Sequence, residues 1–302
     1  MLAASVNPAD LNMIEGTYGI KPKKFPSVPG IEGVGEVLYA DPASGLKPGD
    51  WVVPKIANGF LGTWQPYIVA NNGDMIKLQS KLPLVSAATI LGNPITAYRM
   101  LKEFETLKPG DCVLQNGGNS AVGEAVIQLC REFQLQCISL IRPRPKFELK
   151  PLKARLLSLG NRDTKIITED ELKSTMKGKR AQLGLDCIGG KSAMDVIRFL
   201  ESSRTMVTYG GMSRDPVIIR ASQLIFNDIR IKGFWLSRDA EMNSWDNQTK
   251  VINEFTSLMA SGKFVPPVHK LLPLAKYRVA FKDKGQKGVK YIFTFDNKKA
   301  KE

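Results

Sequence analysis

The chain has 302 residues, which favours two domains at roughly 100–200 residues each. Hydrophobic residues make up 43% and charged residues 24% of the chain, a composition too apolar for a disordered protein. Lys and Arg exceed Asp and Glu by 43 − 29 = 14, and such a positive field attracts nucleic acid, anionic lipid, phosphorylated cofactors or an acidic carrier protein.

The first third of the chain, from Met1 to about Asn93, is dense in Gly and Pro and carries short apolar runs at 35–39 and 51–54. Short strands separated by turn residues are typical of a β-rich lobe. The spacing of apolar residues over 87–104 then predicts a helix.

Strand and helix patterns alternate after residue 111. We expect strands at 112–116, 136–141, 165–167, 182–188, 205–209 and 229–236, and helices at 124–133, 152–159 and 192–200. Such alternation predicts an α/β fold with a doubly wound, buried parallel sheet. A helix at 250–261 and a strand at 289–295 close the chain.

A glycine-rich turn follows the first of these strands, and it reads G-N-S-A-V-G from Gly118 rather than G-x-G-x-x-G. Backbone N–H groups at a helix start can hold a pyrophosphate where no side chain blocks the approach. Alone the turn fits an ordinary tight turn as well as a nucleotide site. The surrounding βαβ series favours nucleotide binding.

The second strand of that series ends at Ile141-Arg142-Pro143-Arg144, without an acidic residue until Glu148. An acidic residue at this position pairs with the ribose 2′-OH of NAD, whereas arginine suits a 2′-phosphate. We therefore predict NADPH rather than NADH, with a solvated arginine loop as the alternative. Glycines at the later strand ends, in 209–212 and 233–237, would let a nicotinamide approach the backbone.

Several segments carry a family resemblance. Residues 5–10 (SVNPAD), 46–52 (LKPGDWV) and 107–111 (LKPGD) resemble the medium-chain dehydrogenase/reductase superfamily. Residues 12–19, 93–101, 209–212 and 233–237 resemble the mitochondrial trans-2-enoyl thioester reductases, which are the enoyl-[acyl-carrier-protein] reductases of mitochondrial fatty acid synthesis. The resemblance runs nearly end to end.

The resemblance implies a homodimer that reduces the 2,3-double bond of enoyl thioesters on acyl carrier protein or coenzyme A with NADPH. It implies a Rossmann doubly wound sheet together with a GroES-like, β-rich catalytic domain. By position, Tyr18 is the catalytic tyrosine and Trp235 shapes the acyl pocket. The residues that fall where the family contacts its cofactor are Asn93, Asn119, Ser120, Ala121, Val122, Arg142, Arg144, Tyr209, Gly210, Gly211, Met212, Phe234, Trp235, Leu236, Ser237 and Lys290.

The resemblance also implies the domain order: a GroES-like domain at 1–96, an NADPH-binding Rossmann domain at 97–236 and a return to the first domain at 237–302. The family has strands before the SVNPAD motif and a mitochondrial transit peptide, so we expect the β-rich domain to be N-terminally truncated. Location is expected to be mitochondrial by resemblance; the first residues lack the features of a transit peptide, which leaves a cytoplasmic location open.

No metal is expected. Zinc-dependent relatives carry Gly-His-Glu where this chain has Gly30-Ile31-Glu32, and Ile31 cannot ligate. One histidine, His269, and four cysteines without CxxC spacing cannot easily form a Cys₂His site. The cysteines are expected to be reduced and packed as small hydrophobes.

No membrane span is expected, because no apolar run reaches about 18 residues. Nucleic acid is not an expected partner, because aromatic residues do not alternate with basic ones. Two alternatives remain. One is a zinc-free NADPH quinone oxidoreductase of the zeta-crystallin type. The other is a truncated, non-catalytic binding or regulatory protein, which only the basic charge supports.

Overall fold

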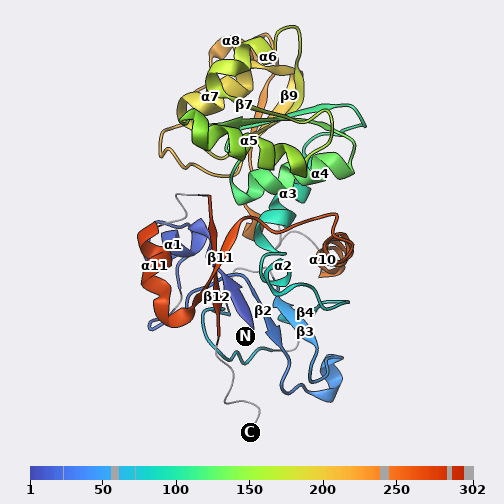
Figure 1. Cartoon of the computed structure of the whole chain (residues 1–302), viewed down its shortest axis with the longest axis vertical. Helices are drawn as coiled ribbons and strands as arrows, with labels where there is room; N and C mark the ends of the chain where they lie inside the picture. The colour runs from blue at the N-terminus through green and yellow to red at the C-terminus, as the bar shows by residue number, and fades with distance from the viewer. Residues whose placement is uncertain (23, 56–60, 72, 239–244, 284–287, 296–302) are drawn as a thin grey trace. The chain divides into compact units, whose positions relative to one another are not determined.

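A computed structural model describes residues 1–22, 24–55, 61–71, 73–238, 245–283 and 288–295 of the chain. The chain divides into unit 1, Met1–Ile95 with Leu236–Glu302, and unit 2, Thr96–Trp235 (Figure 1). No helix within the described residues is long and apolar enough to cross a membrane.

Unit 1 is built on a six-stranded sheet with the order β11-β12-β1-β2-β3-β4. Its strands are β1 (Ala3–Ser5), β2 (Gly33–Glu36), β3 (Trp51–Pro54), β4 (Met75–Lys77), β11 (His269–Pro273) and β12 (Lys290–Thr294). β11 and β12 run parallel, and the other neighbours are antiparallel. β1 lies inside the sheet, because it pairs with β2 on one side and β12 on the other.

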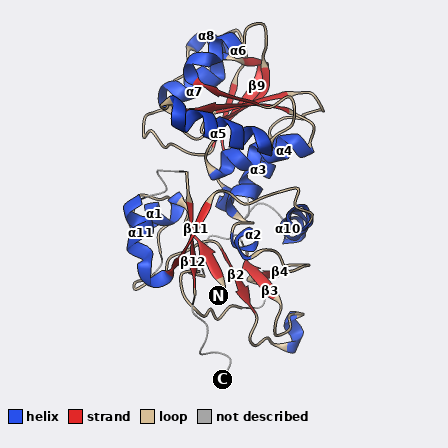
Figure 2. Cartoon of the chain, in the orientation of Figure 1, coloured by secondary structure: helices blue, strands red, loops and turns tan. Residues whose placement is uncertain are grey.

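Helices flank this sheet (Figure 2). They are α1 (Pro8–Ile14), α2 (Leu84–Ala88), α10 (Trp245–Ala260) and α11 (Tyr277–Asp283), with 3₁₀ turns η1 (Pro42–Ser44) and η3 (Leu274–Lys276). The Trp64 ring packs edge-on against Phe293 of β12, with ring centroids 5.0 Å apart. Ala280 of α11 joins the same buried cluster, and Leu11 of α1 packs against it. The two ends of the chain therefore share one core.

Unit 2 carries a parallel six-stranded sheet with the order β10-β9-β8-β5-β6-β7. Its strands are β5 (Cys112–Gln115), β6 (Gln136–Ile141), β7 (Lys165–Thr168), β8 (Ala181–Asp186), β9 (Leu200–Thr208) and β10 (Arg230–Gly233). Counted within the unit, this is the order 3-2-1-4-5-6 of the Rossmann fold, with its switch point between β5 and β8. The predicted doubly wound parallel sheet is therefore confirmed.

Helices and turns connect these strands. They are α4 (Ala121–Glu132), α5 (Lys146–Leu159), η2 (Glu169–Glu171), α6 (Leu172–Thr175), α7 (Gly190–Arg198) and α8 (Ala221–Ile225). Apolar side chains of β5, β6 and β9 form the core between sheet and helices, among them Leu114, Ile138 and Met206. All four cysteines are free and buried, as predicted.

The helix predicted over 87–104 is confirmed over 92–103 but is not continuous, because the segment holds two helices: α2 ends at Ala88 and α3 spans Gly92–Glu103. The Thr89 hydroxyl donates to the carbonyl of Val85 at 2.8 Å and so closes the first helix. The predicted start of α5 at Leu152 is wrong. The helix begins at Lys146 and contains Pro151.

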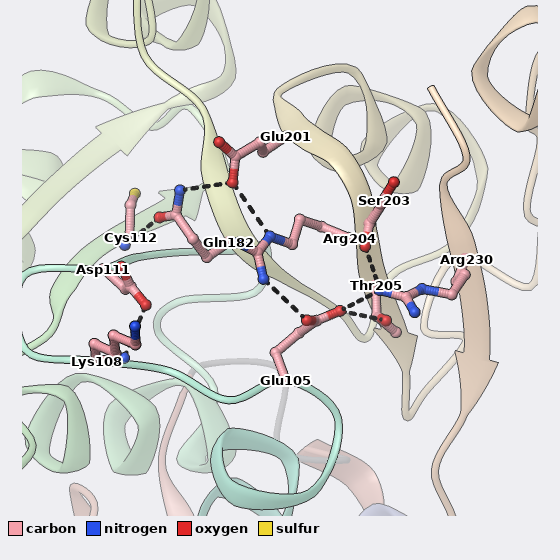
Figure 3. Close-up of polar contacts among 10 residues, drawn as sticks. All are labelled: Glu105, Lys108, Asp111, Cys112, Gln182, Glu201, Ser203, Arg204, Thr205 and Arg230. Atoms are coloured by element: carbon pink, nitrogen blue, oxygen red, sulfur yellow. Dashed lines mark hydrogen bonds and ion pairs between the residues drawn. The ribbon is translucent and has the colours of Figure 1, made fainter. Parts of the chain in front are cut away.

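One edge of the sheet in unit 2 is held by the carboxylate of Glu105, whose side chain is only 7% exposed. Figure 3 shows Arg204 and Arg230 converging on it, at 3.3 and 3.2 Å, and the Thr205 hydroxyl donating to it at 2.6 Å. Arg230 also donates to the carbonyl of Ser203. Since these residues come from β9, β10 and the segment after α3, Glu105 ties the edge strand to the rest of the unit.

Candidate active site

The glycine-rich turn lies between β5 and α4, at the switch point of the parallel sheet. A Cβ on Gly117 would lie 2.4 Å from the Cys187 sulfur, and one on Gly118 would lie 2.7 Å from the Ser139 Cβ. The Ser120 hydroxyl caps α4 by accepting the N–H of Gly123 at 3.0 Å. The backbone at Gly117 and Gly118 thus lies so close to its neighbours that no side chain fits there. The first N–H groups of the 12-residue helix α4 form a site suited to an anion.

A buried polar network holds the strand ends beside this turn. The Asp186 carboxylate, at the end of β8, accepts the Asn116 amide at 2.6 Å and the N–H of Gly189 at 2.9 Å. It also accepts the Thr208 hydroxyl of β9 at 3.2 Å. The side-chain oxygen of Asn116, Oδ1, in turn accepts the N–H of Cys187 at 2.8 Å. The ends of β5, β8 and β9 are therefore fixed relative to one another.

Tyr209 follows β9, and its phenol oxygen is buried. No described residue offers it a hydrogen bond of normal geometry, although the Cys187 thiol and the Ser120 hydroxyl lie close enough to affect its pKa. Burial raises the pKa of the Tyr209 phenol well above its usual value, and it raises the pKa of the Cys187 thiol to about 11. A buried hydroxyl without a partner fits a site whose polar ligand completes it.

The predicted arginines follow β6. Arg142 is exposed, and the Arg144 guanidinium donates to the Arg142 carbonyl at 3.2 Å. Both lie past the carboxyl end of β6, and so fit a phosphate group at this edge of the sheet.

The other predicted residues of unit 2 also follow strands. Asn119, Ser120, Ala121 and Val122 lie in the turn and the first turn of α4, and Gly210, Gly211 and Met212 follow β9. Phe234 and Trp235 follow β10; the Phe234 ring packs edge-on against Phe104, with centroids 6.0 Å apart. Because carboxyl ends of parallel strands share one edge, the sheet brings these residues to the same end of unit 2.

Unit 1 holds the remaining predicted residues: Tyr18, Asn93, Leu236, Ser237 and Lys290. Tyr18 is half-buried in the segment after α1, where its N–H and that of Thr17 donate to the Asn12 carbonyl at 3.2 and 2.8 Å. This segment is thereby anchored to the helix end. The structure thus gathers the predicted residues into two groups, one in each unit.

Lys290, the first residue of β12, is buried, and its ammonium donates to the Asn7 side-chain oxygen at 2.5 Å. Burial lowers the pKa of Lys290, and the carboxylates of Glu32 and Asp10 partly oppose that shift. Asn93, the second residue of α3, has a buried side-chain nitrogen that no described residue accepts. Both side chains fit contacts with a polar ligand.

Asp10 completes the buried cluster of unit 1 with a capping box on α1. Its carboxylate accepts the N–H of Asn7 at 2.7 Å and the N–H of Ile31 at 3.0 Å. Burial raises the pKa of Asp10 to about 7 despite these hydrogen bonds. The sequence carries a signal for this arrangement, since Asn followed by Pro and by an acid three residues on is a helix-start pattern.

Sequence reasoning missed Asn7, Glu32, Asn116 and Asp186 as members of these two networks. Asp186 is a single acidic residue at the end of an apolar strand, shortly before Gly189-Gly190. This pattern is a sequence signal that could have identified Asp186 as a candidate site residue. Among the described residues no group of three or more His, Cys, Asp and Glu could hold a metal ion.

Comparisons with known proteins agree with this architecture. A family model described as the alcohol dehydrogenase GroES-like domain matches residues 1–80. The chain is 45% identical to the mitochondrial enoyl-[acyl-carrier-protein] reductase of Rattus norvegicus over 287 residues, which are 93% of this chain and 75% of that protein.

Two solved structures are similar to nearly the whole chain. The complex of Etr1p with NADP and crotonyl-CoA aligns with a TM-score of 0.87 and 33% identity, over 97% of this chain and 89% of that one. The Etr1p/Etr2p heterodimer of Candida tropicalis, a mitochondrial 2-enoyl thioester reductase, aligns with a TM-score of 0.87 and 32% identity over the same shares.

Proposed function

The chain belongs to the mitochondrial enoyl-[acyl-carrier-protein] reductase family, and we propose that it reduces the 2,3-double bond of trans-2-enoyl thioesters in mitochondrial fatty acid synthesis. It is an NADPH-dependent oxidoreductase of the medium-chain dehydrogenase/reductase superfamily. The observation that carries the substrate is the end-to-end likeness to Etr1p, whose structure holds NADP and crotonyl-CoA.

The residues present fit the dinucleotide. The turn at Gly117–Gly118 leaves no room for side chains, and the Tyr209 oxygen and Asn93 nitrogen are buried without a partner among the described residues. We propose that the pyrophosphate lies at the start of α4, with Arg142 and Arg144 on the 2′-phosphate. The further residues proposed for the cofactor are Asn119 to Val122, Gly210 to Met212, Phe234 to Ser237, and Lys290.

When bound, NADPH supplies the hydride that adds to C3 of the enoyl group. Negative charge then develops on the thioester oxygen, which a positioned hydrogen-bond donor must stabilise. In this proposal the Tyr18 hydroxyl either is that donor or delivers the proton to C2. A phenol can serve as a general acid, because its ordinary pKa is about 10. Trp235, 38% exposed, shapes the acyl pocket.

We propose that two copies associate through the outer edge of the sheet in unit 2. All four residues of β10 are exposed, and among the described strands β10 pairs with β9 alone. Apolar side chains gather in the segment before it, with Ile225 70% and Phe226 80% exposed. An unpaired edge with apolar neighbours favours strand addition, and Etr1p forms a heterodimer with Etr2p. Phe226→Asp should shift the protein to monomer in analytical ultracentrifugation.

Acyl carrier protein is the proposed carrier, steered by basic residues near the site. The clusters predicted for this are Lys21–Lys24 and Lys282–Lys290, of which Lys23 and residues 284–287 lie outside the described residues. An association rate insensitive to salt would argue against steering.

The deciding experiment is NADPH oxidation by the purified protein with crotonyl-CoA, with a quinone, and with no acceptor. We expect oxidation with the enoyl thioester and no more than background with the quinone. Faster turnover of the quinone would instead support the zeta-crystallin type of activity. Failure to bind NADPH, together with salt-dependent binding of nucleic acid, would support the non-catalytic alternative.

A further inference from the structure

The carboxylate of Glu32, which lies just before β2, is buried, with 1% of the residue exposed. It accepts hydrogen bonds from the Ser5 hydroxyl, from the Asn7 side-chain nitrogen at 2.9 Å and from the N–H of Gly92 at 2.6 Å. These three donors are uncharged and come from two segments of unit 1 that are far apart in sequence: Ser5 and Asn7 between β1 and α1, and Gly92 at the start of α3. Glu32 is therefore the point at which β1, the start of α1 and the start of α3 are joined.

A buried carboxylate is a costly way to join segments. Taking an ionised carboxylate out of water costs several kcal/mol unless its lone pairs are satisfied. An amide or an apolar side chain would pack between the same segments at lower cost. The three hydrogen bonds also impose directions that apolar packing does not, which favours a role in orientation.

The first direction leads to Lys290 through Asn7. The Asn7 nitrogen donates to both Glu32 and the Ser5 hydroxyl, at 2.9 and 3.0 Å. The amide is thereby oriented so that its oxygen faces away from the carboxylate, and this oxygen accepts the Lys290 ammonium at 2.5 Å. Glu32 thus orients the Asn7 amide so that its oxygen, rather than its nitrogen, faces Lys290.

The second direction leads to Asn93 through the backbone. Gly92 is the first residue of α3, and its N–H is one of the helix donors that no intrahelical carbonyl can satisfy. A Cβ on Gly92 would lie 3.2 Å from the Glu32 Oε2 atom, so the carboxylate packs directly on this residue. Holding Gly92 fixes the backbone from which the next side chain, Asn93, departs with its unpartnered nitrogen.

We propose that Glu32 is a positioning residue that sets Lys290 and Asn93 for contact with NADPH, without touching the cofactor itself. The inference rests on the proposed function, because it assumes that these two side chains meet the dinucleotide. It adds that one buried carboxylate controls both, through Asn7 and through Gly92.

Glu32→Gln tests this, because the added NH₂ group must face one of the three donors. Hydrogen bonds to a charged group are worth about 1.5–3 kcal/mol, so we expect the Kd for NADPH, measured by fluorescence titration without substrate, to rise about 10- to 100-fold. The matched control is Thr63→Val, since the buried Thr63 hydroxyl donates to the backbone oxygen of Glu32 at 3.0 Å. It should lower the melting temperature comparably and leave the Kd unchanged.

A double-mutant cycle with Lys290→Gln separates positioning from general damage. If Glu32 acts through Asn7, the two substitutions together should weaken NADPH binding clearly less than the sum of their separate effects. Should Glu32→Gln fail to fold, Asn7→Ala cuts the Lys290 branch alone and enters the same cycle. An unchanged Kd at Glu32→Gln, or full additivity in the cycle, would overturn the inference. Wild-type protein that does not bind NADPH would instead overturn the proposed function.

Discussion

The two units hold their candidate residues differently. In unit 2 the candidate residues near the anion-binding turn are organised by main chain: a glycine turn that excludes side chains and the open start of α4. In unit 1 they are organised by buried ionisable side chains: Asp10 accepts the N–H of Ile31, Glu32 accepts the N–H of Gly92, and Lys290 donates to Asn7. The turn of unit 2 should lose its ligand when a substitution adds atoms to it. The buried cluster of unit 1 should lose its arrangement when a substitution changes a charge or a hydrogen-bond acceptor, even if the side chain keeps its shape.

The difference has a chemical reason. A pyrophosphate carries its own charge and needs only convergent N–H groups and free space. The end of the cofactor that reacts, and the thioester beside it, need donors placed where charge develops during the reaction. We therefore expect substitutions at the turn of unit 2 to weaken NADPH binding by removing space. In unit 1 we expect Tyr18 to act on turnover, the buried side chains around Glu32 to act on binding through orientation, and Asp10 to act on the dependence of stability on pH.

The largest effect is expected at Tyr18. Tyr18→Phe removes one hydroxyl and should lower kcat by about 10²- to 10⁴-fold, the range of general acid catalysis, with the Kd for NADPH unchanged. Stopped-flow turnover of crotonyl-CoA and a separate binding titration measure the two quantities. Tyr39→Phe is the control, because Tyr39 lies in the same unit and is 87% exposed. Near-normal kcat in Tyr18→Phe would remove Tyr18 from the mechanism.

The next largest effect is expected at Gly118, where binding of NADPH should weaken while kcat stays unchanged. In Gly118→Ala the new Cβ would lie 2.7 Å from the Ser139 Cβ and 3.3 Å from the Leu140 carbonyl oxygen, so the turn must move. Overpacking of this kind costs about 1–3 kcal/mol, and we expect the Kd for NADPH to rise about 10- to 100-fold. Residual turnover at saturating NADPH should keep its kcat.

Gly178→Ala is the matched control for Gly118→Ala. Gly178 has a φ of +69°, and a Cβ added to it would meet nothing within 4 Å, so alanine there strains the backbone without a clash. It should destabilise unit 2 by about 1 kcal/mol and leave NADPH binding intact. Equal loss of binding in both variants would mean that general destabilisation, rather than the turn, sets affinity.

A smaller effect is expected at the arginines after β6. Arg142→Ala and Arg144→Ala should each reduce the preference for NADPH over NADH by about tenfold, the value of one charge-assisted hydrogen bond. Competitive titrations of the two cofactors give the ratio. Arg162→Ala is the control, because this side chain is 93% exposed in the same unit. An unchanged ratio in both arginine variants would contradict the assigned contact.

The sequence predicts strands of both sheets well where apolar runs bounded by turn residues mark buried strands. The strands predicted at 51–54 and 136–141 have those bounds in the structure. The break between α2 and α3 was missed because the apolar spacing continues across it, while the Thr89 hydroxyl and Glu32 decide where the helices end and begin.

The buried cluster of unit 1 could not be predicted from spacing. Asn7 and Lys290 are 283 residues apart, and they meet only because β12 pairs with β1. By contrast, the glycine turn, Arg142 and Arg144 lie on contiguous strand–turn segments, so local pattern was enough to single them out. A family resemblance was needed for Tyr18 and Lys290, which no local pattern distinguishes from ordinary residues.

The smallest effect, and the one most particular to unit 1, is the dependence of stability on pH at Asp10. Burial raises the pKa of Asp10 to about 7, so the folded protein keeps a proton that the unfolded chain has already released. Its contribution is therefore complete only below about pH 4, the pKa of the unfolded chain, declines as the pH rises, and is lost once the pH has passed 7. Between about pH 6 and pH 8 we expect the free energy of unfolding to fall by about 1 kcal/mol from this group.

Asp10→Asn tests that slope. Asparagine cannot accept the N–H groups of both Asn7 and Ile31, so the variant should be less stable at every pH, but its stability should no longer fall across this range. Urea unfolding at several pH values measures both. The comparison with the variant is needed because other groups also contribute: burial lowers the pKa of the Met1 amino group from its usual value of 8.0. Burial also lowers the pKa of Lys290. Both of these groups make stability rise with pH, opposite to Asp10, and both are shared by wild type and variant. Parallel curves for wild type and variant would show that Asp10 is ionised throughout, and the contrast between the two units would then rest on Glu32 and Lys290 alone.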